Sequence, residues 1–323
     1  MKDQLEKISI CDTSLYKVKH DTPIQNVILR FLHTAWGTLK EDKIPPFFPG
    51  PQPISIERRH FPILKKNKYV VCEKTDGVRY MCIITRYEDK KVCLLVNRKL
   101  DMFLVSLNFL RTSYDGTILD GELVKNKNSG KWYYLVYDAV MINGEDIKSR
   151  NLDERISLAH TVVSGIKRLA KDPLTIKMKM FHKMSGIQDF CEKELENLEF
   201  NTDGLVFTPV NDTIKIGTHE TLFKWKPRDQ NTIDFQLVYR PKSWGLYIQE
   251  RGNLVFQSEI KHEEAPEWFV EKSIVECKYD SNKFKWVPLA IRTDKTYPNN
   301  RRTFYRTMVN IAEDIQIKEF YSL

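Results

Sequence analysis

A lysine at the end of a strand-like segment is the strongest candidate for chemistry in this sequence. The β-forming run Tyr69-Val70-Val71-Cys72 leads to Lys74, and Asp76-Gly77 predicts a turn directly after it. A second β-forming run, Tyr80–Ile84, follows the turn. A lysine in this position can act as a nucleophile once it has lost its proton. It can also be an ordinary exposed lysine in a hairpin, and this segment alone does not decide between the two.

Four other segments place charged residues inside or beside apolar strand-like runs. They are Ile118–Val124 with Asp120 and Glu122, Tyr133–Val140 with Tyr137 and Asp138, Thr202–Phe207 with Asp203, and Leu222–Pro227 with Lys224 and Lys226. In the last segment the two lysines are two residues apart, so a strand would place both ammonium groups on one face. An unpaired buried charge is costly, and we therefore expect these segments to support one another in a single cleft.

The composition indicates a folded, basic, two-domain protein. The chain has 323 residues, a formal net charge of +8 and charges of mixed sign. This length favours two domains, and the excess of positive charge suits an anionic partner such as RNA, DNA or nucleotide phosphates. Basic runs such as Arg58-Arg59 and Arg301-Arg302 are candidates for RNA contact or simply solvated surface.

The pattern of apolar residues predicts an α+β fold. We expect a helix over 24–32, opened by Thr22 as cap and Pro23 at its first position, and an extended surface segment over 45–53. Strands are predicted at 68–74, 79–86, 91–97, 101–106, 117–124, 132–140, 175–176, 204–208, 213–216 and 221–226. Helices are predicted over 153–170, capped by Asp153, and over 185–196.

A proline and polar residues at 227–231 indicate a linker. Five short strands follow, at 232–239, 245–249, 254–258, 273–279 and 284–291, and predict a small OB-type β-barrel. A terminal helix is expected over 302–315. The predicted domains are therefore 1–228, 232–310 and a C-terminal helix at 311–323 that could pack back on the first domain.

Cysteine and histidine usage argues against a structural metal site. The six cysteines, Cys11, Cys72, Cys82, Cys93, Cys191 and Cys277, form no C-x-x-C pair, and the seven histidines have no metal-binding spacing. We expect a reducing compartment, with Cys72, Cys82 and Cys93 as small core residues. No apolar run reaches the length of a membrane span and the N-terminus has no signal-peptide core, so we expect a soluble intracellular protein.

Taken in order, the charged segments resemble the six collinear motifs of the covalent nucleotidyltransferases. The matching segments are Lys74-x-Asp76-Gly77, Asp120-Gly121-Glu122, Tyr137-Asp138-Ala139, Asp203–Phe207, Lys224-Trp225-Lys226-Pro227 and Arg292-Thr293-Asp294-Lys295. That superfamily comprises mRNA capping guanylyltransferases and ATP-dependent DNA and RNA ligases. Phe223–Pro227, Thr232–Phe235 and Pro298-Asn299 resemble guanylyltransferases in particular. Pro49–Arg58 looks most like the single-function chlorella-virus type, which would make the protein viral and place it in the host cytoplasm or nucleus.

The resemblance implies a nucleotidyltransferase (ATP-grasp-like) domain with antiparallel sheets and an OB-fold domain. It also implies a two-step transfer of GMP, from GTP to Lys74 and then to the 5′-diphosphate end of RNA, giving the GpppN cap. The lysine pKa would be depressed by Lys224, Lys226 and Arg79, by desolvation, or by a metal-bound substrate. A divalent ion, Mg²⁺ or Mn²⁺, would be bound by Asp203, by Glu122 and by phosphates.

The resemblance assigns further residues to GTP. Thr75, Asp76 and Gly77 belong to the lysine motif, Arg79, Arg98 and Glu122 would contact the ribose or position the phosphates, and Tyr137 would stack on guanine. Lys179 would hydrogen-bond the base; its alternative is a solvent-facing strand lysine. Asp203 would orient the metal or the amine, and Lys224 and Lys226 would hold the α-phosphate. Arg292, Asp294 and Lys295 would grip the β- and γ-phosphates as the domains close.

Two other functions stay open at this point. An ATP-dependent polynucleotide ligase would use the same lysine, and a catalytically dead member would serve as an RNA-binding subunit. No triphosphatase or methyltransferase signature is present, so those activities are expected in separate proteins. The sequence does not report an oligomeric state, and we expect a monomer without membrane partners.

Overall fold

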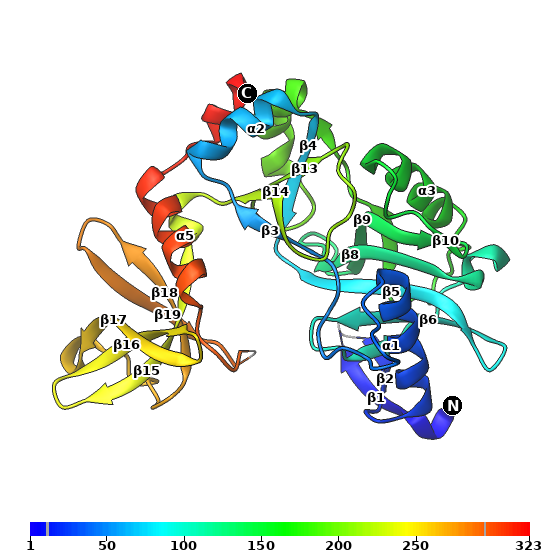
Figure 1. Cartoon of the computed structure of the whole chain (residues 1–323), viewed down its shortest axis with the longest axis horizontal. Coiled ribbons are helices and arrows are strands. Elements are labelled where there is room, and N and C mark those ends of the chain that lie inside the picture. Colours follow the sequence, from blue (N-terminus) through cyan, green and yellow to red (C-terminus); the bar gives the residue numbers. More distant parts are fainter. Residues whose placement is uncertain (11–12, 294) are drawn as a thin grey trace. The chain divides into compact units, whose positions relative to one another are not determined.

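The structure is a computed structural model that describes residues 1–10, 13–293 and 295–323, so Cys11 and Asp294 lie outside the described residues. The chain forms two compact units (Figure 1). The first comprises Met1–Ile54 and Ile63–Phe223, and the second comprises Ser55–Pro62 and Lys224–Leu323. No helix in the described ranges is both long and apolar enough to cross a membrane.

A large sheet forms most of the first unit. Its strand order is β1-β2-β7-β6-β5-β8-β9-β10, with antiparallel neighbours, and β11 pairs parallel with β9. The strands are β1 (Leu5–Ile10), β2 (Thr13–Val18), β5 (Val78–Tyr87), β6 (Lys90–Asn97), β7 (Met102–Leu104), β8 (Thr117–Lys125), β9 (Trp132–Ile142), β10 (Glu145–Asp146) and β11 (Thr175–Met178).

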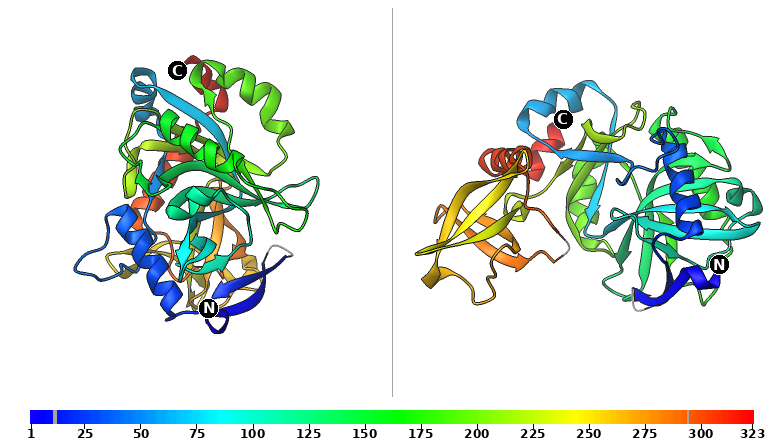
Figure 2. Two further views of the ribbon diagram at one scale, coloured as in Figure 1. Left: turned by 90° about the vertical axis from the view of Figure 1, so that its right-hand side faces the viewer. Right: turned by 60° about the horizontal axis from the view of Figure 1, so that its bottom comes forward.

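Helices cover both faces of this sheet, as Figures 1 and 2 show. Successive side chains of a strand point to opposite faces. Met81 and Ile83 of β5 accordingly share a core with α1 (Pro23–Trp36), whereas Cys82 and Ile84 share one with α3 (Leu152–Ser164). Burial on both faces explains why β5 reads as a continuous apolar run.

A second sheet carries the lysine. Its order is β12-β4-β13-β14-β3, formed by β12 (His182–Lys183), β4 (Tyr69–Thr75), β13 (Thr202–Pro209), β14 (Gly217–Trp225) and β3 (Pro51–Ser55). The last residues of β14 and β3 belong to the second unit. β3 contains Pro51 and Pro53 and lies at the sheet edge, where a missing backbone N–H is tolerated.

The turn after Lys74 connects the two sheets and does not close a hairpin. β4 pairs with β12 and β13, whereas β5 pairs with β6 and β8. Gly77 is required by close packing, because an added Cβ would lie 2.4 Å from Val124 Cγ1 and 2.7 Å from the Leu123 carbonyl oxygen. The φ of Gly77 is not positive, so close packing, and not a left-handed backbone conformation, accounts for the glycine.

The second unit is built on a five-stranded antiparallel sheet. Its order is β17-β16-β15-β18-β19, formed by β15 (Thr232–Arg240), β16 (Ser243–Glu250), β17 (Asn253–Lys261), β18 (Ile274–Asp280) and β19 (Lys285–Ile291). All five predicted strands are present. Within the described residues β17 and β19 are the edges of the sheet, so the closed barrel that we predicted is not formed. Phe304 and Ile311 of α5 (Arg301–Glu313) join the core of this sheet.

Several local predictions are corrected. Thr22 precedes α1 but makes no capping hydrogen bond, and Asn151, not Asp153, caps α3 by accepting from the Glu154 amide.

The predicted helix over 153–170 ends at Ser164. The predicted helix over 185–196 is present as a continuous helical segment of mixed type, with 3₁₀ turns at Met184–Gly186 and Leu195–Asn197, α4 (Ile187–Asp189) and a π-helical stretch over Phe190–Glu194. Residues 213–216 form no strand. The short helix α2 (Phe61–Lys66) was not predicted, and the terminal helix ends at Glu313, followed by a turn of 3₁₀ helix over Ile317–Ser322.

Candidate active site

Lys74 lies next to Asp203, to which its ammonium donates a hydrogen bond of 2.7 Å from Nζ to Oδ1. The two residues lie on adjacent strands, and the pairing shifts between Thr202 and Leu205, so Lys74 faces the bulge formed by Asp203 and Gly204. A bulge places two residues opposite one and redirects a side chain. Gly204 has a φ of 150°, a backbone angle that favours glycine. The lysine side chain is 24% exposed, so a ligand can reach it.

The opposite face of β4 carries a buried polar cluster. Lys179 directly follows β11 and is buried, and its ammonium donates to Thr75 Oγ1 at 2.9 Å. Its Nζ also lies 3.8 Å from a carboxylate oxygen of Glu73 and 3.9 Å from one of Glu122. The Thr75 hydroxyl donates to Glu122. The alternative of a solvent-facing lysine is therefore wrong for Lys179.

Burial has a clear electrostatic effect in this cluster. It raises the pKa of the Glu73 carboxyl, and the Lys179 ammonium opposes that shift. Glu73 precedes the candidate nucleophile in sequence but points to the other face of the strand, as the alternation of side chains requires. Sequence reasoning missed this residue, and the only signal was a carboxylate within an otherwise apolar run.

Arg79, Asp120 and Tyr137 form a second buried network. Arg79 donates to both carboxylate oxygens of Asp120, from Nε at 2.9 Å and from Nη2 at 2.5 Å, and to the Pro51 carbonyl oxygen. The Tyr137 hydroxyl donates to Asp120 Oδ1 at 2.9 Å. Tyr137 is the extra residue of a bulge in β9, opposite Asp120 and Gly121 of β8. Asp120 thus positions two of the residues predicted to bind the nucleotide.

These contacts also set the ionisation of the network. Burial of the Arg79 guanidinium lowers its pKa, but the charge and hydrogen bonds of Asp120, together with Tyr137 and Tyr134, raise it, and the net shift is upward. Burial raises the pKa of Tyr137, and Asp120 adds to that shift against the opposing effect of Arg79. Arg79 therefore stays charged and Tyr137 stays a hydroxyl donor.

Asp138 belongs to a different ion pair. Its carboxylate accepts from Arg155 Nε at 2.7 Å and from Nη2 at 3.0 Å, and the Arg155 side chain is only 3% exposed. Arg155 also donates to the backbone carbonyls of Arg150 and Asp212. This pair fastens α3 to β9 and to the loop before β14, so it is structural. Arg155 was part of a predicted helix, and nothing in its local sequence indicated its partner.

Three further residues of the first unit that were predicted to bind GTP lie at the surface. They are Asp76, Gly77 and Arg98. Asp76 is exposed in the turn between the sheets, where its amide donates to the Asn201 carbonyl oxygen. Gly77 packs against β8, as described above. Arg98 is exposed in the turn after β6.

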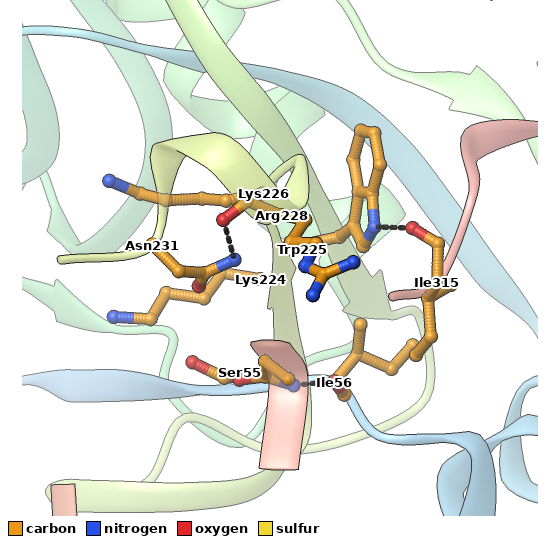
Figure 3. A pocket seen from close by; sticks show the side chains of 9 residues that line it. Ser55, Ile56, Lys224, Trp225, Lys226, Arg228, Asn231 and Ile315 are labelled. Atoms are coloured by element: carbon orange, nitrogen blue, oxygen red, sulfur yellow. Dashed lines mark hydrogen bonds between the residues drawn. The ribbon is translucent and has the colours of Figure 1, made fainter. Parts of the chain in front are cut away.

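In the second unit, Lys224 and Lys226 line a small cleft with Ser55, Asn231 and Asn310 (Figure 3). Both ammonium groups extend to the same side in Figure 3, as their spacing predicts for a strand and its end. Trp225, between them, points the other way and donates from its indole nitrogen to the Ile315 carbonyl oxygen at 2.9 Å. The cleft therefore presents two cations on an anchored segment.

Arg292 and Lys295, two further predicted phosphate ligands of the second unit, both pair with Asp234. Sequence reasoning did not select Asp234 as a site residue. Arg292 Nη1 lies 3.1 Å from Asp234 Oδ1, and Lys295 forms an ion pair with the second oxygen of Asp234. Asp234 is 5% exposed. Its backbone amide donates to the Asn299 side-chain oxygen at 2.9 Å, and its backbone carbonyl oxygen accepts from the Asn299 amide at 2.8 Å. Asp294 lies outside the described residues.

The described residues contain no cluster of three or more His, Cys, Asp or Glu side chains that would hold a metal ion. Carboxylate oxygens such as those of Asp203 and Glu122 suit a hard cation that keeps waters and phosphate oxygens as its other ligands.

The site thus combines a partly exposed lysine, paired with a carboxylate, with buried polar side chains on antiparallel sheets. Comparison with protein families specifies the class. Residues 13–228 match the mRNA capping enzyme catalytic domain, and residues 230–321 match the mRNA capping enzyme C-terminal domain. The chain belongs to the mRNA capping enzyme family, and its activity is that of an mRNA guanylyltransferase.

Individual relatives agree with this assignment. The mRNA-capping enzyme subunit alpha of Schizosaccharomyces pombe is 29% identical over 315 residues, covering 84% of this chain and 78% of that protein. The mRNA-capping enzyme of Mus musculus is 28% identical over 290 residues, covering 83% of this chain. The chain spans about half the length of the mouse and zebrafish relatives, at 48% and 47%.

Among solved structures, a mycobacterial DNA ligase D complexed with ATP and MES has a TM-score of 0.44 and 14% identity, covering 76% of this chain and 95% of that chain. That likeness is too distant to assign a function. The ligase alternative fits less well than capping, because the family match and the named relatives are capping enzymes. These relatives are fungal and metazoan, so the resemblance to the chlorella-virus type stays a prediction.

Proposed function

We propose that Lys74 is the residue that carries GMP during cap formation. The observation that carries this proposal is the hydrogen bond between Lys74 and the Asp203 carboxylate at an accessible strand end. In the first step the deprotonated amine attacks the α-phosphorus of GTP. A P–N bond forms, the bond from the α-phosphorus to the bridging oxygen breaks, pyrophosphate leaves, and the nitrogen releases one proton to solvent. Asp203 orients the amine and accepts a hydrogen bond from it.

In the second step an oxygen of the terminal phosphate of 5′-diphosphate RNA attacks the same phosphorus. The P–N bond breaks, GMP passes to the RNA to give GpppN, and the lysine amine regains its proton. No oxidation state changes in either step, so the transfer needs no reductant or oxidant. Both steps need positive charge around the phosphates, and such preorganised charge is a large contribution to catalysis.

Guanine recognition is proposed for Lys179 and Thr75, with the ring of Tyr137 stacked on the base. Guanine has an acceptor oxygen at position 6 where adenine has an amino donor. An ammonium has only donors, so Lys179 can satisfy the guanine oxygen but not the adenine amino group. Its contact with Thr75, the neighbour of Lys74, supports a base site next to the nucleophile. This chemistry favours GTP over ATP and hence capping over ligation.

The remaining contacts are proposed by resemblance and by charge. Arg79, Arg98 and Glu122 would bind the ribose or position the phosphates, with Asp76 and Gly77 shaping the turn. Lys224 and Lys226 would hold the α-phosphate, and Arg292, Asp294 and Lys295 the β- and γ-phosphates. The pairing of Arg292 and Lys295 with Asp234 supports a preassembled cationic pair.

A divalent metal ion, Mg²⁺ or Mn²⁺, is proposed to bind near Asp203 and Glu122. When bound, such an ion neutralises phosphate charge during the transfer. The second unit is proposed to be an open OB-type fold, supported by its five antiparallel strands and the helix α5 packed on their core. A separate RNA triphosphatase and a separate cap methyltransferase would complete the pathway, as in a chlorella-virus-type system.

The test is covalent labelling with GTP that carries a radioactive α-phosphate. The protein should form an adduct that survives denaturation, and Lys74→Ala should abolish it. Lys68→Ala is a matched control, because Lys68 also pairs with an aspartate, Asp153, at 2.7 Å but lies before β4. Persistent labelling of Lys74→Ala would disprove the assignment. Labelling with ATP in place of GTP would instead favour a ligase.

A further inference from the structure

Glu73 is a buried carboxylate for which the reaction described above has no role. It lies on β4 directly before Lys74, is 6% exposed and pairs across the sheet with Leu205 of β13. A carboxylate in this position is costly to bury unless a positive charge lies near it. The nearest ammonium is that of Lys179, whose Nζ lies 3.8 Å from Glu73 Oε1.

The geometry around Lys179 leaves hydrogen-bond donors unused. An ammonium has three donors, and in the described part of the chain Lys179 gives one of them to a side chain, that of Thr75. The oxygens of Glu73 and Glu122 are 3.8 and 3.9 Å away, which is too far for a direct hydrogen bond. The two carboxylates therefore balance the charge of the ammonium without occupying its remaining donors.

The two carboxylates are not equivalent. Glu122 accepts a hydrogen bond from the Thr75 hydroxyl, so one of its carboxylate oxygens is already engaged as an acceptor. Glu73 has no such side-chain donor among the described residues, and Lys179 is the cation that faces it. Thr75 and Glu73 lie two residues apart on β4 and thus on the same face as the ammonium.

We propose that Glu73 is a positioning residue that makes the enzyme select purines with an oxygen at position 6, by balancing the charge of the Lys179 ammonium and keeping it aimed with free donors. This inference rests on the proposed function of Lys179 in base recognition. It assigns specificity to a residue that does not touch the substrate. Glu73→Gln would leave the shape of the site nearly unchanged but remove half of the negative charge beside the ammonium.

The experiment measures equilibrium binding of GTP, ITP and ATP in a Lys74→Ala background, where the nucleotide cannot be consumed. ITP retains the oxygen at position 6 but lacks the 2-amino group. Glu73→Gln should weaken binding of both GTP and ITP about tenfold and leave ATP unchanged, which lowers the GTP-to-ATP preference by about tenfold. Glu73→Asp retains the charge and should keep most of the preference.

Glu57→Gln is the matched control, because Glu57 is also 6% exposed but pairs with Arg59 in the second unit. It should not change the GTP-to-ATP preference. An unchanged preference in Glu73→Gln, equal losses for GTP and ATP, or equal losses in the Gln and Asp variants would overturn the inference. Covalent labelling tests the proposed function separately, so labelling by GTP with no effect of Glu73 on the preference would reject the inference alone.

Discussion

Asp120 offers a sharp test of how the nucleotide-binding residues are positioned. Its side chain is 2% exposed, and it holds both Arg79, through two hydrogen bonds, and the hydroxyl of Tyr137. The substitution Asp120→Asn keeps the size of the side chain and removes its charge. The Arg79 guanidinium, only 10% exposed, would then lack its counter-ion.

Breaking a buried ion pair on one side typically costs about 3–5 kcal/mol, because the remaining charge is left uncompensated. Arg79 retains a hydrogen bond to the Pro51 carbonyl oxygen and lies over the ring of Phe48, with 5.4 Å to the centroid. We therefore expect the lower end of that range, about 3 kcal/mol. For a domain of roughly 200 residues this corresponds to a fall in Tm of about 6–12 °C.

The chain contains a matched control in the same sheet. Asp138 is the strand partner of Asp120 and forms its own bidentate pair with the buried Arg155, which is not a proposed nucleotide ligand. Asp138→Asn should therefore cause a comparable loss of stability. Only Asp120→Asn should also slow adduct formation at low GTP concentration, by about tenfold, which corresponds to about 1.4 kcal/mol.

The assay compares thermal unfolding and covalent labelling of both variants, with labelling measured well below the lower Tm. Equal losses of labelling in the two variants would show that the effect is general destabilisation. A destabilised Asp120→Asn that labels like the wild type would refute the role of this network in nucleotide binding. A loss of stability below about 1 kcal/mol would refute the burial argument itself.

Three further predictions concern packing, charge and pH. Gly77→Ala should destabilise the first unit by about 1–3 kcal/mol in chemical denaturation, because the new Cβ would contact Val124 at 2.4 Å; unchanged stability would contradict this. Asp234→Asn should slow adduct formation about tenfold, while transfer from a preformed adduct to RNA is spared, because Arg292 loses its anchor; equal slowing of both steps would argue against it. Burial lowers the pKa of His219 below its usual 6.5, so the unfolded chain binds the proton first and stability should fall as the pH drops below about 6.5. His219→Gln should flatten that fall in urea titrations, and an unaltered slope would exclude this histidine as its source.

Local sequence was sufficient for the strands and for the candidate nucleophile. The alternation of apolar residues reflects side chains on two faces of a strand, so the positions of β4, β5, β8 and β9 could be predicted within a few residues. The ordered motifs also led to the family that the comparisons show. Caps and turns were less accurate. Thr22 makes no capping hydrogen bond, Asn151 caps α3 in place of Asp153, and Gly77 is required by close packing.

The sequence by itself thus determined which residue types are available for chemistry and on which strands they lie. Only the tertiary structure decided their partners. Lys74 meets Asp203 through a bulge in a strand 129 residues further along the chain, and Lys179 is buried against Thr75 from 104 residues away. The physical reason is that strand periodicity is a local property, whereas the register of distant strands and the burial of a charge depend on which segments pack together. The partners of Glu73, Asp120 and Asp234 lie far away in sequence, so the local sequence did not indicate them.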